Sequence, residues 1–223
     1  MIVSNQEQLR EYAWKHQLSE KLELSRIPSR YRYEVKEWNP AQKGVFNICK
    51  TAFTGTGAII ALVGERGTGK TTLAAQLIIN RLWEDWERLE SGEVAFLWRN
   101  VPYRKMSDLI ARFKPLYGDF GSLDMDTLIN ARSSYCGDNT LAIIDELHDC
   151  EDQKMKDRIL TDILDRRYSE MNDTLLISNQ TVKAFNQSVS DSVRSRICEH
   201  GRIIECVWES FRENGTAKNA HTI

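Results

Sequence analysis

The chain has 223 residues, and its 30 Lys and Arg residues nearly balance its 32 Asp and Glu residues, which gives a formal net charge of −2. With 41% hydrophobic and 28% charged residues, the composition excludes intrinsic disorder over most of the length. The charge balance excludes a generally basic, histone-like nucleic-acid binder, although it is compatible with a local basic patch. The length fits one domain with a sizeable core and a short appendage.

The cysteines and histidines do not form a recognisable metal site. None of the five cysteines belongs to a C-x-x-C pair, and the four histidines lack the spacing of a zinc site. The amino terminus turns polar at Ser4, so it has no signal-peptide core, and no apolar run approaches the ~20 residues of a membrane span. We therefore expect a cytoplasmic protein with reduced thiols and no membrane contact.

The first 26 residues are predicted to form a single helix. Residues 4–7, Ser-Asn-Gln-Glu, have the pattern of a capping box, and we expect the helix to run to about Ser25. Trp14, Leu18 and Leu22 stand four residues apart and form a narrow apolar stripe. This stripe either packs on the rest of the domain or docks on a partner, and the sequence leaves both interpretations open.

The remainder of the chain alternates between apolar runs and helical patterns. Pro28 ends the first helix, because the residue before a proline avoids the α region. We expect strands at 58–63, 94–98, 141–144, 174–178 and 203–208, and helices at 41–53, 70–89, 107–116, 124–132, 153–169 and 188–198. This alternation predicts a three-layer α/β/α fold with a mainly parallel, five-stranded sheet. Residues 27–212 would form this domain without a full helical lid, followed by a flexible tail at 213–223.

The segment between the strand at 58–63 and the helix at 70–89 matches the phosphate-loop pattern G-x-x-x-x-G-K-[ST]. Its glycines allow backbone N–H groups to turn inward around a phosphate, and the following helix contributes its positive N-terminal end. Lys70 would reach the β- and γ-phosphates, and Thr71 would ligate Mg²⁺. We expect ATP or ADP with Mg²⁺ to bind at Gly64, Glu65, Arg66, Gly67, Thr68, Gly69, Lys70, Thr71 and Thr72.

Polar side chains follow two of the later strands. Asp145 and Glu146 come directly after the strand at 141–144, and Asn179 follows the strand at 174–178. Asp145 would hold Mg²⁺ through water, and Glu146 would polarise the water that attacks the γ-phosphate. Asn179 would orient that water or contact the γ-phosphate. A second carboxylate at this place favours hydrolysis over phosphoryl transfer to a metabolite.

Other segments extend these motifs into a longer pattern. They are Ile-Pro-Ser-Arg-Tyr-Arg at 27–32, Ile-Leu-Asp-Arg-Arg-Tyr at 163–168, Val-Arg-Ser-Arg-Ile at 193–197 and Val-Trp-Glu-Ser-Phe-Arg at 207–212. Taken in order with the motifs above, they resemble the AAA+ ATPase domain of DnaC/DnaI-type bacterial or phage replicative helicase loaders. The resemblance covers roughly residues 27–212.

The resemblance implies an ATPase that assembles into a ring, spiral or filament. Arg196 matches the family's arginine finger, which reaches the ATP site of a neighbouring subunit, and Arg194 is the nearby alternative. Arg212 matches a sensor-2-like arginine. The implied catalytic set is Lys70, Glu146, Asn179, Arg196 and Arg212.

The resemblance further implies a protein of DNA replication that places the replicative helicase on single-stranded DNA. Basic and aromatic residues suited to DNA contact are Arg99, Tyr103, Arg104, Lys105, Arg112 and Lys114. Residues 1–26 would then provide the docking helix. An IstB-like transposition helper and a nucleotide-dependent binding switch with little turnover are the alternatives, and a metabolite kinase fits least.

Overall fold

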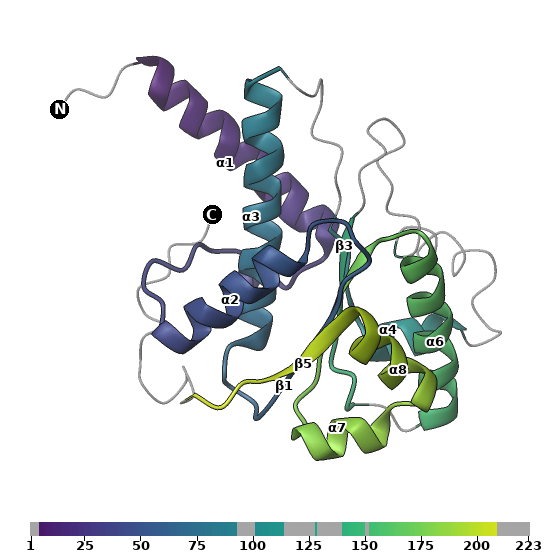
Figure 1. Ribbon diagram of the computed structural model, residues 1–223. Helices are drawn as coiled ribbons and strands as arrows, with labels where there is room; N and C mark the ends of the chain where they lie inside the picture. Colours follow the sequence, from purple (N-terminus) through teal and green to yellow (C-terminus); the bar gives the residue numbers. More distant parts are fainter. Residues whose placement is uncertain (1–4, 93–100, 114–127, 129–139, 150–151, 209–223) are drawn as a thin grey trace.

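The computed structural model describes residues 5–92, 101–113, 128, 140–149 and 152–208 (Figure 1). Five strands form one sheet: β1 Ile59–Val63, β2 Tyr103–Lys105, β3 Leu141–Asp145, β4 Asp173–Ile177 and β5 Gly201–Glu205. The strand order is β2-β3-β4-β1-β5, and every neighbouring pair is parallel. The expected α/β fold with a parallel, five-stranded sheet is therefore confirmed.

Helices cover both faces of this sheet. The first face carries α1 Asn5–Ser25, α2 Pro40–Ala52 and α3 Lys70–Glu90, and the second carries α4 Met106–Phe113, α6 Gln153–Ser169 and α8 Asp191–His200. A 3₁₀ turn, Ser29–Tyr31, and the short helix α7 Val182–Ser188 complete the described elements. Side-chain caps fix several helix starts, since Asn39, Asp152, Thr181 and Ser190 each accept a hydrogen bond from a first-turn N–H.

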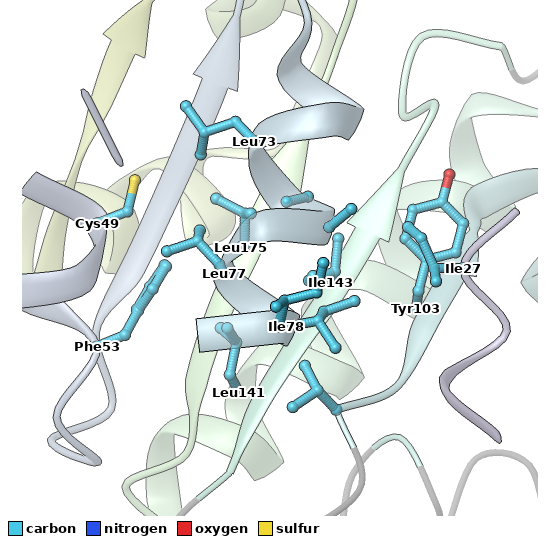
Figure 2. Packing of buried hydrophobic residues seen from close by; sticks show 14 of the residues in the cluster. Ile27, Cys49, Phe53, Leu73, Leu77, Ile78, Tyr103, Leu141, Ile143 and Leu175 are labelled. Atoms are coloured by element: carbon cyan, nitrogen blue, oxygen red, sulfur yellow. The ribbon is translucent and has the colours of Figure 1, made fainter. Parts of the chain in front are cut away.

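The alternation of side chains along β1 divides the core into two clusters. Ile60 and Leu62 point to the side of α1, α2 and α3, whereas Ile59, Ala61 and Val63 point to the side of α6 and α8. Figure 2 shows the first cluster, in which apolar side chains of α3 pack over those of β3 and β4. Because both faces of β1 are buried, its residues are apolar throughout.

The apolar stripe of α1 belongs to the first cluster. Trp14, Leu18 and Leu22 are 7%, 1% and 0% exposed, and the Trp14 ring lies 4.8 Å and 5.8 Å from the rings of Trp83 and Trp86 on α3. Figure 1 shows α1 crossing α3. The stripe therefore packs on the domain, and docking of a partner on residues 1–26 stays a prediction that would have to use other side chains of α1.

Four predicted elements differ from the structure or fall outside it. The strand expected at 94–98 lies outside the described residues, as does almost all of the helix expected at 124–132; β2 occupies the sheet position beside β3. The helix expected at 188–198 corresponds to α8, which begins later, at Asp191, because Val189 and Ser190 are extended and the Ser190 side chain caps it; the preceding helix α7 was not predicted. The last strand begins at Gly201 and ends at Glu205.

Candidate functional site

The phosphate loop joins the carboxyl end of β1 to the start of α3. Gly64, Gly67 and Gly69 have φ angles of 134°, 91° and 80°, which side chains other than glycine rarely adopt. A Cβ atom at Gly64 would lie 2.6 Å from the Cys206 carbonyl oxygen, so this glycine also permits the loop to approach the end of β5. The Gly64 N–H donates to the Gln180 carbonyl at 2.8 Å, which ties the loop to the tip of β4.

Lys70 is buried at the centre of the loop. Its Nζ donates to the carbonyl oxygens of Gly64 and Glu65 at 2.8 Å and 2.7 Å and to Thr68 Oγ1 at 3.1 Å. Burial lowers the pKa of Lys70, and the nearby Asp145 and Cys206 oppose this change. An ammonium group inside a glycine-rich loop at a helix N-terminus is suited to bind a polyphosphate.

Asp145 lies at the end of β3, beside the start of α3. Its Oδ2 accepts hydrogen bonds from Thr71 Oγ1 at 2.8 Å and from the Tyr103 hydroxyl at 2.7 Å, and its Oδ1 accepts from the Glu146 N–H at 2.6 Å. Burial raises the pKa of Asp145, while these three hydrogen bonds lower it. The residues fit Mg²⁺, because hydroxyl and carboxylate oxygens meet here and a cation would offset the desolvation of the carboxylate.

Glu146 follows with a left-handed backbone, at φ 59°. Residues other than glycine seldom adopt this conformation, and those that do are concentrated at functional sites. The Glu146 Oε1 lies 3.0 Å from Lys105 Nζ, and this hydrogen bond raises the pKa of Lys105. Glu146 therefore lies next to the candidate metal ligand Asp145 and forms an ion pair with Lys105.

Asn179 at the tip of β4 contacts a histidine that the sequence analysis did not select. The Asn179 N–H donates to His148 Nδ1 at 3.3 Å, and Asn179 Nδ2 lies 3.2 Å from His148 Nε2. Arg66 of the phosphate loop reaches the same Nε2 at 3.3 Å. The imidazole ring thus connects the phosphate loop, the turn after β3 and the tip of β4. Nothing in the sequence indicated this role, because His148 belongs to no recognisable motif.

Two further contacts bear on Thr68 of the loop. Trp208 Nε1 donates to the Thr68 carbonyl at 2.6 Å, and Gln42 Nε2 approaches the same oxygen at 3.5 Å. Helix α2 and the segment after β5 therefore contact the loop from outside. The sequence offered no signal for either contact, since both partners lie far from the loop along the chain.

The two candidate arginine fingers, Arg194 and Arg196, make their contacts away from this cluster. Arg196 on α8 forms an ion pair with Asp165 of α6, Nε to Oδ1 at 2.5 Å, and its Nη1 donates to Ser192. Arg194 pairs with Asp191 and donates to the Asn186 carbonyl at 2.8 Å. Arg212 lies outside the described residues.

The expected DNA-contacting surface is wrong for two of its residues. Tyr103 and Arg104 are 3% and 4% exposed, and Arg104 donates to the carbonyls of Tyr103 and Ser25. They are buried because residues 103–105 form β2 rather than a solvent-facing segment. Arg99 and Lys114 lie outside the described residues.

The arrangement as a whole combines a phosphate loop, a magnesium-type oxygen pair and a carboxylate. These groups lie at the carboxyl edge of the parallel sheet, where ligands bind in open α/β folds. A loop of this kind can bind the phosphates of a nucleotide, the oxygen pair can hold Mg²⁺, and a carboxylate beside them can activate a water. None of the helices in the described part of the chain is long and apolar enough to cross a membrane.

No protein-family model and no curated protein matches the chain. Solved structures do match it. A primosome component described as putative, from Streptococcus pyogenes serotype M3, is 17% identical with a TM-score of 0.57, over 86% of this chain and 95% of that one. The DnaC helicase loader is 20% identical with a TM-score of 0.54, over 77% of this chain and 93% of that one.

Replication initiators share the fold as well. A DnaA structure bound to AMPPCP and single-stranded DNA is 19% identical with a TM-score of 0.53, over 78% of this chain and 48% of that one. The chain spans about half the length of three of the initiator structures it matches, and 68% of a chain of domain III of DnaA from Thermotoga maritima. At these identities the comparisons show the fold alone, which this chain shares with a helicase loader, a primosome component and replication initiators.

Proposed function

We propose that this chain binds ATP with Mg²⁺ and hydrolyses it to ADP and phosphate. The observation that carries the proposal is the convergence of Lys70, Thr71 and Asp145 at the phosphate loop, with Glu146 directly after Asp145. Residues 64–72 would bind the phosphates, and Thr71 and Asp145 would hold the metal ion. Magnesium, when bound, supplies the positive charge that neutralises the developing charge on the phosphate oxygens.

Glu146 is the proposed general base. The Glu146 carboxylate would accept the proton of the attacking water after its ion pair with Lys105 has broken. Asn179 would orient the water or the γ-phosphate. Arg196 would act on the site of a neighbouring subunit, because in its own chain it pairs with Asp165. Arg212 is proposed to contact the nucleotide from the segment that follows β5.

We further propose that the ATPase serves DNA replication as a helicase loader. Support comes from the share of each matched chain that is covered, which is 93% for the DnaC loader and 95% for the primosome component, but between 48% and 68% for the DnaA and initiation-factor chains. The partner would be a replicative helicase. Single-stranded DNA, which is present in the DnaA structure, is the proposed nucleic acid.

One reconstituted reaction tests both parts of the proposal. The purified chain is mixed with replicative helicase, circular single-stranded DNA, ATP and Mg²⁺, and phosphate release and DNA-bound helicase are measured together. The native chain should release phosphate and increase the amount of DNA-bound helicase. Glu146→Gln should lower phosphate release at least ~100-fold while ATP binding persists, since it removes the base and not the phosphate ligands.

Lys70→Ala is the control for nucleotide binding, because it removes the buried ammonium group. Equal hydrolysis by Glu146→Gln and the native chain would refute the role of Glu146. Hydrolysis without any gain in DNA-bound helicase would refute the loader role. A response to a transposase in place of the helicase would instead identify a transposition helper.

A further inference from the structure

His148 is held in place by a rigid turn at the end of β3. The next residue toward β3, Leu147, is fully buried, and its N–H donates to the Ile177 carbonyl at 3.2 Å. The Asp149 N–H closes the turn on the Glu146 carbonyl at 3.1 Å. This turn therefore carries the imidazole across to the tip of β4, where Asn179 stands.

Both ring nitrogens of His148 contact the same asparagine. Nδ1 faces the Asn179 backbone N–H at 3.3 Å, and Nε2 faces the Asn179 side-chain amide at 3.2 Å. A histidine that contacts both the backbone and the side chain of one residue restrains its main chain and its amide rotation together. These contacts therefore hold Asn179 at a partly buried position.

The donors and acceptors of the His148 ring and of Asn179 can be matched in one way. Burial and the Arg66 charge lower the pKa of His148, although Asp149, Glu146 and Asp145 oppose this, so the ring is neutral near pH 7.5. With Nδ1 accepting from the Asn179 N–H, the neutral ring carries its proton on Nε2. The matching partner of Nε2–H is the amide oxygen of Asn179, which a 180° rotation of the amide supplies. Arg66 has only donors, so it cannot form a hydrogen bond with Nε2 while that nitrogen carries the proton.

We propose that His148 is a positioning residue that fixes the backbone and side-chain amides of Asn179 at the tip of β4. The inference deepens the proposed ATPase function and rests on it, because Asn179 is the group assigned to the γ-phosphate or the attacking water. His148 touches neither reactant in this assignment. Its effect reaches the reaction through Asn179.

The kinetic test is a double-mutant cycle on ATP hydrolysis. His148→Ala should lower kcat about tenfold and leave the KM for ATP within about twofold, because a lost hydrogen bond of this kind weakens transition-state orientation more than binding. In an Asn179→Ala background the same substitution should have almost no further effect. His148→Gln should recover part of the rate, because its amide offers a donor and an acceptor. His16→Ala, an exposed histidine of α1, should match the native chain.

A second measurement separates this proposal from the proposed function. Hydrogen exchange at the Asn179 backbone amide is followed in the nucleotide-free protein, where its acceptor is His148 Nδ1. His148→Ala should accelerate this exchange by about tenfold, and His16→Ala should not. If His148→Ala accelerates exchange at Asn179 but the native chain does not hydrolyse ATP, the ATPase proposal is overturned and the His148–Asn179 contact is supported.

Two results would overturn the role of His148. The first is unchanged exchange at Asn179 in both His148→Ala and His148→Gln. The second is independent loss of kcat in the double mutant, equal to the product of the single losses. Using both substitutions also guards against a variant that fails to fold, since His148→Gln keeps most of the side-chain volume.

Discussion

At the scale of single residues, Asp145 illustrates how the site tolerates a buried charge. The carboxylate is 3% exposed and accepts hydrogen bonds from Thr71, Tyr103 and its neighbour Glu146. These donors stabilise the ionised form, and burial opposes it with the larger effect on the pKa. Tyr103 thus supports the carboxylate of the proposed metal ligand, and burial, together with the contact to Asp145, raises the pKa of Tyr103.

Tyr103→Phe should destabilise the protein by about 1–2 kcal/mol at pH 8, because it removes one donor from a buried carboxylate. Since the pKa of folded Asp145 is already raised, the folded state holds its proton more tightly than the unfolded state, and stability falls as pH rises through the acid range. The substitution raises this pKa further, so its cost should grow from low to high pH. Urea denaturation with EDTA present measures it.

Tyr12→Phe is the matched control for this prediction, because Tyr12 is 70% exposed on α1. Its effect on the free energy of unfolding should stay near zero at every pH. A cost for Tyr103→Phe that is independent of pH would contradict the link to the ionisation of Asp145.

At the scale of elements, α1 is part of the domain rather than a separate arm. Its inward side chains pack among those of α3, and Arg10 near its start forms an ion pair with Glu90 at the end of α3. An amphipathic helix gains most of its stability from such packing and little from its own propensity. Any partner that docks on α1 must therefore use its outward face, where Leu9, Tyr12 and Leu24 are exposed.

Leu22→Ala should destabilise the protein by about 2–5 kcal/mol, because it removes a fully buried side chain and leaves a cavity. Leu24→Ala, at a site 52% exposed in the same helix, should change stability by less than about 0.5 kcal/mol. Denaturant titration of both variants provides the comparison. If the two cost the same, α1 does not pack on the domain in solution.

At the scale of the whole molecule, Arg66 of the phosphate loop contacts His148, whereas the two arginines proposed as the finger make their contacts elsewhere in the described part of the chain. Arg196 and Arg194 lie on α8 and pair with α6 and with their own helix. An arginine supplied by a second copy is consistent with this placement and with the proposed assembly. It would stabilise charge on the γ-phosphate during transfer.

Arg196→Ala should retain ATP binding and lose hydrolysis by ~10³–10⁵-fold. Its intact phosphate loop should regain activity when Lys70→Ala subunits, which keep Arg196, are mixed in. Arg194→Ala removes the alternative arginine finger, and it should keep most of its activity if Arg196 is the finger. Phosphate release measured across a range of mixing ratios decides the matter, and no recovery at any ratio would rule out a shared site.

The amino-acid sequence determined the local features of this protein. The phosphate loop, the apolar runs of β1, β3 and β4, and the carboxylates after β3 follow from neighbours in the chain, because burial on both faces requires apolar residues and phosphate binding requires glycine. The start of α3 at Lys70 and the bounds of α6 were predicted to the residue. These properties depend on local periodicity and local backbone freedom.

Only the tertiary structure decided which distant residues meet. The strand β2 has three residues and no apolar run, so its pairing with β3 depends on register, and that register brings Tyr103 to Asp145 and Lys105 to Glu146. The burial of Trp14 against α3 and the contact of His148 with Asn179 likewise depend on how the elements pack. Side-chain meetings across strands are set by strand order and crossing geometry, which local sequence does not encode.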